Sequence, residues 1–225
     1  MEEWIFRVTA VALPAILAIT LHEAAHGFVA WRLGDDTAYR LGRVTFNPLR
    51  HIDPFGTVLL PALMYFTTGF VFGWAKPVPV NFERLNHPRR DMVWVALAGP
   101  GTNFVLALLS AILWGLVNPE HGIIQHWLRA AAEVSILVNV ILMVFNLIPL
   151  PPLDGGRVAV GILPDILAFP LARLERFGMP ILLAAFFLLP MLGRQIGVDL
   201  NIMTWLMGPP VDAVIDLIQI LTGNG

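Results

Sequence analysis

Three ionisable residues interrupt a long apolar run near the N-terminus, in the order His22-Glu23-Ala24-Ala25-His26. At 3.6 residues per turn, a helix places His22 and His26 on one face, one turn apart, with Glu23 beside them. Ionisable side chains in such a helix are costly and face protein or a water-filled cavity. The chain must therefore fold so that other segments cover this face.

The composition indicates an integral membrane protein that contacts the lipid bilayer. Of the 225 residues, 57% are hydrophobic and 13% are charged, whereas soluble domains are about a quarter charged. The net charge is −2 and no basic block is present, so we expect no nucleic-acid partner. Because the chain has no cysteine, a metal site must use His, Asp or Glu.

The apolar runs predict an all-α polytopic membrane protein, a bundle of about five to six transmembrane helices, since a span needs roughly 20 apolar residues. We expect one membrane-embedded domain over residues 1–225, with a core at 4–160 and further helices at 161–225. The runs lie at residues 4–33, 54–73, 91–117, 124–148, 179–192 and, more weakly, 200–222.

Arginine and lysine placement indicates the orientation. The connections at 32–53 and 74–90 hold four positive residues each, eight of the fourteen, and the connection at 118–123 holds none. Basic loops stay on the cytoplasmic side, so we expect the N-terminus outside. With both flanks on one side, the run at 54–73 should enter the membrane and return as a re-entrant hairpin, packed against protein.

The spacing of the two histidines is the one by which a helix offers two imidazoles to zinc and a carboxylate to its water. A catalytic zinc site takes three protein ligands, so a third must come from elsewhere. Asp154 is the strongest candidate, because the prolines at 149–152 end the preceding helix at the same membrane end. The other histidines lie in polar connections, where surface positions are commoner: His51, His87, His121 and His126.

A Gly-x-x-x-Asn pair, Gly99 and Asn103, lies on one face at the start of the third apolar run. Small residues let helices approach closely, so packing is our main interpretation of the glycine. Asn103 is either an interhelical hydrogen-bond partner or a substrate contact, and both alternatives stay open. Gly99 is a candidate for substrate contact as well.

In this order, HEAAHG, AGPGTN and NLIPLPPLDGG resemble the signatures of the site-2 protease family of intramembrane zinc metalloproteases. GWAKPVPVN resembles a segment of its compact prokaryotic members, which lack a PDZ or nucleotide-sensing domain. The resemblance covers residues 10–160 and says little about 178–225.

The resemblance implies one Zn²⁺ per chain, held by His22, His26 and Asp154, with Glu23 as the general base. It implies a role for Asn146 in substrate binding or oxyanion support. The implied substrate is a transmembrane segment of another membrane protein, cut near its cytoplasmic end. The implied location is the prokaryotic cytoplasmic membrane, with the active site near the cytoplasmic face.

An extended substrate needs backbone partners, which a strand edge supplies. Residues 39–46, which include Val44, and 78–81, which end at Asn81, predict short cytoplasmic β-strands that could bind substrate. A strand that only organises the loop is the alternative.

Two other functions stay open. The chain could be a membrane metal-binding or metal-transport protein. Transport should show ionisable residues on several spans that form a path, and here they gather at one level. A silent scaffold that binds membrane helices tends to lose the glutamate or a ligand, and here all four residues are present. Nothing in the sequence indicates an oligomeric state.

Overall fold

The computed structural model describes residues 3–60, 62–63 and 73–224. Four segments of this part of the chain are long and apolar enough to cross a membrane: α1 (Glu3–Arg32), α4 (Pro88–Leu116), α5 (Ile123–Asn146) and the stretch Glu175–Ile196. The last comprises α8 (Glu175–Leu183), the π-helical turn η5 (Ala184–Leu188) and α9 (Leu189–Ile196). The helical membrane architecture is confirmed.

Shorter elements connect these segments. They are α2 (Thr37–Arg40), η1 (Pro48–Arg50), η2 (Pro54–Leu59), η3 (Phe82–Arg84), η4 (Pro119–His121), α6 (Asp154–Ile162), α7 (Asp165–Arg173) and α10 (Ile202–Thr222). The described residues thus hold four candidate spans, fewer than the five to six expected. One reason is that α10 carries Asp212 and Asp216 and is not among the candidates.

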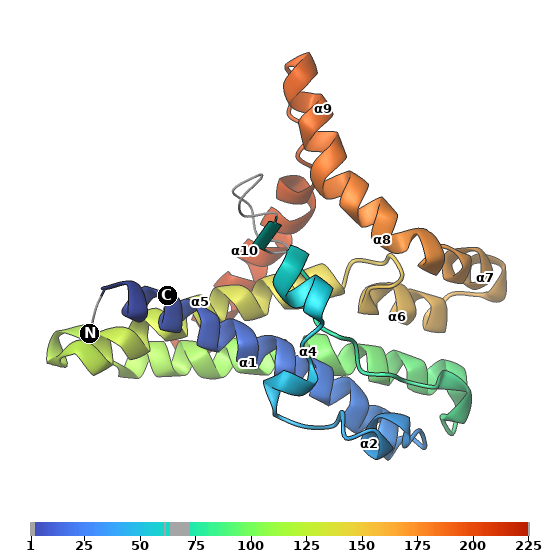
Figure 1. Cartoon of the computed structure of the whole chain (residues 1–225), viewed down its shortest axis with the longest axis horizontal. Helices are drawn as coiled ribbons and strands as arrows, with labels where there is room; N and C mark the ends of the chain where they lie inside the picture. Colours follow the sequence, from blue (N-terminus) through green and yellow to red (C-terminus); the bar gives the residue numbers. More distant parts are fainter. Residues whose placement is uncertain (1–2, 61, 64–72, 225) are drawn as a thin grey trace.

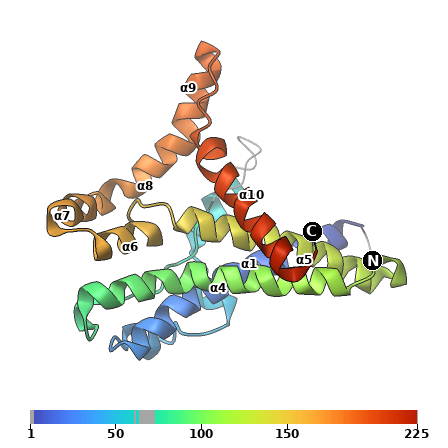
Figure 2. The ribbon, with the colours of Figure 1, turned by 180° about the vertical axis from the view of Figure 1, so that it is seen from behind.

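Helices α1, α4 and α5 pack side by side as a three-helix bundle (Figure 1). Helix α10 returns along the bundle and packs on α5 and α4 (Figure 2). Its Ile218 is 1% exposed and fills the space between small or branched residues of the two long helices. These are Ala107, Ala111, Val140 and Val144. Small side chains let the backbones approach closely, which favours helix packing in lipid.

The two ends of the bundle differ. The start of α1 and the end of α10 lie together at one end, whereas α2, α6 and α7 gather at the other (Figures 1 and 2). The stretch formed by α8 and α9 projects away from the bundle. On α1, large apolar side chains such as Leu17 (54% exposed) face outward, as expected against lipid.

Residues 73–81 form an extended segment, which we call the strap. Its backbone amides bond to turns and side chains: Trp74 N–H donates to the Gly56 carbonyl (3.0 Å) and Lys76 N–H to the His51 carbonyl (2.8 Å). Near its end, Asn81 N–H donates to the Asp35 carboxylate (2.7 Å).

The prediction of short β-strands is wrong for the residues described. Residues 39–46 begin within the helical turn α2 and continue as bends, and residues 78–81 have no strand partner. The reason is physical: the strap amides of Trp74, Lys76, Val78 and Asn81 donate to the Gly56 and His51 carbonyls and to the carboxylates of Glu23 and Asp35, so these groups do not need a neighbouring strand. The hairpin expected at 54–73 starts as η2, but residues 61 and 64–72 lie outside the described part, and it stays a prediction.

Candidate metal centre

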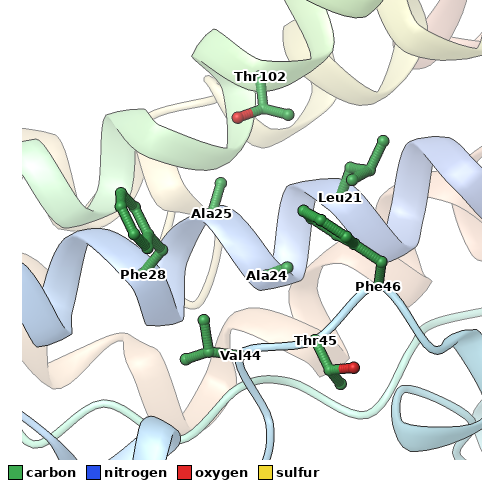
Figure 3. A pocket seen from close by; sticks show the side chains of 8 residues that line it. All are labelled: Leu21, Ala24, Ala25, Phe28, Val44, Thr45, Phe46 and Thr102. Carbon is green, nitrogen blue, oxygen red and sulfur yellow. The ribbon is translucent and has the colours of Figure 1, made fainter.

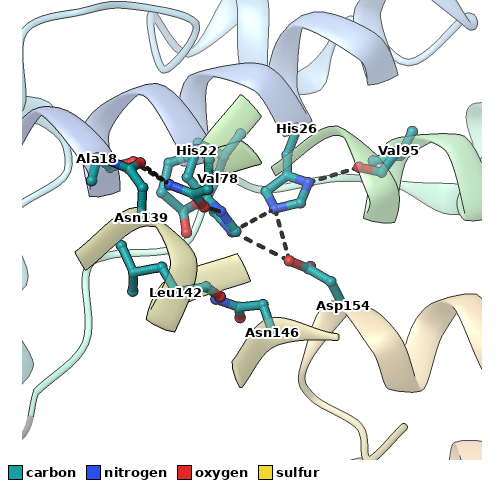
Figure 4. Close-up of polar contacts among 11 residues, drawn as sticks. Ala18, His22, His26, Val78, Val95, Asn139, Leu142, Asn146 and Asp154 are labelled. Atoms are coloured by element: carbon teal, nitrogen blue, oxygen red, sulfur yellow. Dashed lines mark hydrogen bonds and ion pairs between the residues drawn. The ribbon is translucent and has the colours of Figure 1, made fainter. Parts of the chain in front are cut away.

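Helices α1 and α6 bring His22, His26 and Asp154 together inside the bundle (Figure 4). The two Nε2 atoms lie 3.0 Å apart. Asp154 Oδ2 is 3.2 Å from Nε2 of His22 and 3.3 Å from Nε2 of His26. All three residues are buried, with exposures of 6%, 9% and 7%. The three atoms therefore form a nearly equilateral triangle closed off from the surroundings.

The outer nitrogens of both rings are held by oxygen acceptors. Nδ1 of His22 lies 2.5 Å from Asn103 Oδ1, and Nδ1 of His26 lies 2.7 Å from the Val95 carbonyl oxygen. A carbonyl oxygen only accepts, so each neutral ring carries its proton on Nδ1. The lone pair of each Nε2 then points into the triangle, which is the arrangement that metal-binding histidines use.

The donor set fits a zinc ion. Two imidazole lone pairs and a carboxylate oxygen face one another, and Asp154 Oδ2 is a buried atom with no hydrogen-bond donor. Ligand atoms about 2.0–2.1 Å from a tetrahedral zinc lie roughly 3.4 Å from one another. An ionised carboxylate is the form that binds metal.

Two glycines let the start of α6 reach the histidines. A Cβ on Gly155 would overlap the Leu147 carbonyl, and one on Gly156 would overlap the backbone nitrogen of Pro151. Helix α5 ends at Asn146, and the chain then turns tightly through 147–153 before α6 begins at Asp154. The Asp-Gly-Gly sequence thus combines a ligand-type side chain with the close approach that positions it.

Gly99 permits a similar contact between α4 and α1. A Cβ at this position would overlap His26 Nε2 and would lie 2.6 Å from His22 Nε2. At Gly99, the structure therefore shows close packing of α4 against α1, which was our main interpretation of this glycine. Asn103, one turn later, is fully buried and makes interhelical hydrogen bonds. A substrate contact for either residue stays a prediction.

Glu23 lies beside the histidines and is engaged by the strap. The Val78 N–H donates to Glu23 Oε2 at 2.7 Å. Val78 also packs near Gly27 of α1, where a Cβ would lie 3.0 Å from the valine Cγ1. Glu23 is therefore partly buried, and its carboxylate is held by the strap.

Asn146 ends α5 on the side of the metal centre (Figure 4). Its amide nitrogen donates to the Leu142 carbonyl at 2.9 Å, which leaves a second N–H. Asn81 has a local structural role, because its side chain accepts from Glu83 N–H at the start of η3. Its predicted contact with substrate is a separate matter and stays a prediction.

Val44 lines an apolar groove of about 540 Å³ on α1 (Figure 3). The other lining residues are Leu21, Ala24, Ala25, Phe28, Thr45, Phe46 and Thr102. At 100° per residue, the α1 members of this set face away from Glu23. The groove therefore does not lie on the face of α1 that carries Glu23. A substrate contact for Val44 stays a prediction.

Several buried polar residues were missed by the sequence reasoning. His51, expected at the surface, is 2% exposed, and Asp35 and Arg43 are also buried. These three hold the strap; Arg43, for example, donates to the Lys76 carbonyl at 2.8 Å. Nothing in their local sequence separates them from other polar loop residues. Asn139 was also missed, although an asparagine in an apolar helix, four residues after Ser135, was a usable signal.

Taken together, these features define a polytopic membrane protein with a candidate metal centre inside its helical bundle. Residues 118–189, which include Asn146 and Asp154, match Peptidase family M50. The Bacillus subtilis (strain 168) protein named "Putative zinc metalloprotease YwhC" is 38% identical over 178 residues, 76% of this chain and 77% of that protein. The chain therefore belongs to Peptidase family M50, the site-2 protease family.

A second relative is "Putative zinc metalloprotease Rip2" of Mycolicibacterium smegmatis (strain ATCC 700084 / mc(2)155). It is 32% identical over 142 residues, which cover 62% of this chain and 52% of the relative. The Rip2 protein of Mycobacterium tuberculosis (strain ATCC 25618 / H37Rv) is 32% identical over 172 residues, 76% of this chain and 64% of that protein. No solved structure matches the chain.

Proposed function

We propose that this chain is an intramembrane zinc metalloprotease. It hydrolyses a peptide bond within, or near the cytoplasmic end of, a transmembrane segment of another membrane protein. The observation that carries the proposal is the buried triangle of three acceptor atoms, 3.0–3.3 Å apart, with a carboxylate beside it. Three converging ligand atoms at these distances are stabilised by a cation, and the family membership supports a peptidase function.

In this proposal His22, His26 and Asp154 hold one Zn²⁺. Zinc, when bound, acidifies a water molecule and polarises the scissile carbonyl. Glu23 accepts the proton of that water and later delivers it to the leaving amine. The Val78 N–H holds one carboxylate oxygen of Glu23, which limits the orientations available to the other oxygen.

Asn146 is suited to stabilise the developing oxyanion through its second amide N–H. Donors of this kind contribute on the order of 3 kcal/mol where they have been removed from other enzymes. The substrate helix must unwind before cleavage, because its peptide bonds are otherwise hidden by intrahelical hydrogen bonds. We propose that the unwound segment runs beside the strap, on the face of α1 that carries Glu23.

We also propose that the end of the bundle formed by α2, α6 and α7 faces the cytoplasm of a prokaryotic cell, with the start of α1 outside. The basic connections support this orientation. Because the chain has no cysteine, Leu41→Cys, directly after α2, and Glu120→Cys, in η4, each provide one exposed labelling site at opposite ends of the bundle. A membrane-impermeant thiol reagent added outside intact cells should label Glu120→Cys only. Labelling of Leu41→Cys alone would reverse the orientation.

The experiment for the activity co-expresses the chain with candidate single-span membrane proteins. The wild type should release a shortened fragment, and Glu23→Gln should release none while it retains zinc. Glu133→Gln, an exposed glutamate on α5, serves as the matched control and should cleave normally. A list of membrane proteins that accumulate with Glu23→Gln would identify the substrates.

Two results would count against the protease. If wild type and Glu23→Gln bind zinc but yield identical fragments from every candidate, metal binding or transport becomes the better explanation. If the wild type binds no zinc, the metal centre itself is wrong. A protein that binds membrane helices without zinc would then fit the scaffold alternative.

A further inference from the structure

A chain of hydrogen bonds connects the metal centre to the middle of α5. Asn103 Oδ1 lies 2.5 Å from Nδ1 of His22, and Asn103 Nδ2 donates to Asn139 Oδ1 at 2.8 Å. Asn139 Nδ2 in turn donates to the backbone carbonyl of Ser135 at 2.9 Å. The two asparagines are 0% and 1% exposed. One helix contributes each side chain: α1 the histidine, α4 the first asparagine and α5 the second.

Backbone carbonyls determine the direction of this chain. The Ser135 carbonyl can only accept, so the amide nitrogen of Asn139 must face it and the amide oxygen must face α4. That oxygen requires a donor from Asn103, whose Nδ2 also donates to the Ala18 carbonyl at 3.3 Å. The oxygen of Asn103 is then left for His22, and His22 must carry its proton on Nδ1.

We propose that Asn139 is a positioning residue of the metal centre. It orients the Asn103 amide, and Asn103 thereby keeps the Nε2 lone pair of His22 directed toward Asp154 and His26. Without Asn139, only the longer 3.3 Å bond to the Ala18 carbonyl holds the Asn103 amide nitrogen, and the amide can rotate by 180° and present its NH₂ group to the ring when that bond breaks. A donor there favours the opposite tautomer, in which Nε2 carries the proton and cannot bind a metal. The inference rests on the proposed role of His22 as a ligand.

A buried network of this kind needs a specific reason, because an unsatisfied amide inside the bundle is costly. Asn139 lies in a helix whose other buried residues are Ala131, Ala132, Val140 and Val144. Apolar side chains therefore suffice for packing elsewhere on that helix. Asn139 occurs at the level where α4 contacts His22. Hydrogen bonds to the outer nitrogen of a metal-binding histidine orient the ring and set its tautomer.

The experiment measures zinc affinity of the full chain in detergent, by competition with a chelator, without any substrate. Removal of such supporting partners lowers metal affinity by roughly 10–100-fold, and we expect this for Asn139→Ala. In its neutral form, Asn139→Asp donates through its hydroxyl to the Ser135 carbonyl and accepts from Asn103 with its other oxygen, so it should remain within about threefold of the wild type. Ser110→Ala removes the 2.7 Å bond between the Ser110 and Ser135 hydroxyls. The Ser135 hydroxyl also accepts from Asn139 Nδ2 at 3.2 Å, but the Ser135 carbonyl still holds that nitrogen at 2.9 Å, so zinc affinity should be unchanged.

A double-mutant cycle distinguishes positioning from general packing. If Asn139 acts only through Asn103, the variant with both asparagines changed to alanine loses no more affinity than Asn103→Ala alone. Independent structural losses would multiply instead, which would overturn the proposal. An Asn139→Ala variant that folds and binds zinc within about twofold of the wild type would overturn it as well. Failure of the wild type to bind zinc would refute the ligand assignment itself, so the two failures are distinguishable.

Discussion

The backbone N–H of Val78 donates a 2.7 Å hydrogen bond to the carboxylate of Glu23. The two residues are 55 positions apart in the chain. This contact links the strap to the helix that carries both histidines. A backbone donor has no side-chain rotamers, so it can hold a carboxylate more rigidly than a long side chain would. The strap is thus part of the proposed catalytic site and does more than connect two helices.

Replacing Val78 by proline removes this N–H. Hydrogen bonds to charged groups contribute about 1.5–3 kcal/mol, and each 1.36 kcal/mol is a factor of ten in rate. We expect kcat to fall about tenfold or more for Val78→Pro, with zinc content unchanged. Val78→Ala retains the N–H and is the matched control, which should keep most of the rate. Equal rates in the two variants would show that the hydrogen bond is unimportant.

Gly99→Ala should abolish zinc binding. The added methyl would overlap His26 Nε2 and lie 2.6 Å from His22 Nε2, so the rings must move apart or the helices must separate. Gly101→Ala in the same helix meets no atom within 4 Å and should be neutral, or stabilising by up to about 1 kcal/mol. Zinc content after dialysis measures the loss of zinc binding, and the temperature of thermal unfolding measures the change in stability. A Gly99→Ala protein with full zinc occupancy would contradict the close packing described above.

Asp35→Ala should destabilise the connection between α1 and the strap. Its buried carboxylate accepts from Thr37 N–H (3.1 Å), Thr37 Oγ1 (2.5 Å) and Asn81 N–H (2.7 Å). Loss of a buried acceptor leaves its donors unsatisfied, at roughly 1–3 kcal/mol. Thermal unfolding should occur several degrees lower, with faster proteolysis within residues 73–81.

The neighbouring Asp36 is the control for that prediction. It pairs with Arg40 (2.5 Å) and Arg84 (3.2 Å) at the surface, where ion pairs contribute about 0–1 kcal/mol. Asp36→Ala should therefore unfold close to the wild-type temperature. If it were as unstable as Asp35→Ala, charge rather than buried hydrogen bonding would explain both results.

Zinc should stabilise the folded chain. A ligand present at 100 times its Kd adds about 2.7 kcal/mol to the free energy of unfolding, so removal of zinc with a chelator should lower the unfolding temperature. Asp154→Asn should abolish the zinc-dependent part of that change. Asp165→Asn, at an exposed aspartate of α7, should keep it. If zinc raised the unfolding temperature of Asp154→Asn as much as that of the wild type, Asp154 would not be a zinc ligand.

Local patterns anticipated much of this protein. A helix over residues 4–33 follows from its apolar run, and α1 spans Glu3–Arg32. The prolines at 149–152 predicted the end of the preceding helix, and α5 ends at Asn146. Grouping His22, His26 and Asp154 depended on spacing and membrane depth, and the structure brings these side chains together. Their role as zinc ligands stays a prediction.

The errors in the loop segments share one cause. Alternating residues at 39–46 and 78–81 indicated strands, yet the strap amides bond to Glu23, Asp35 and the His51 carbonyl. His51 was expected at the surface and is buried beneath the strap. An alternation with a period of two residues shows that a segment can form a strand. A strand also needs a neighbouring strand that pairs with its backbone. No local pattern reveals which distant groups will satisfy a backbone.

The sequence alone determined the helical membrane class and the face on which two imidazoles and a carboxylate meet, because these depend on periodicity and hydrophobicity within single segments. Only the tertiary structure decided that hydrogen bonds connect Asn139 through Asn103 to His22, that Val78 holds Glu23, and that Gly99 leaves room for both rings. These contacts join residues 36 to 81 positions apart. They arise from the packing of separate helices, which no short stretch of sequence specifies.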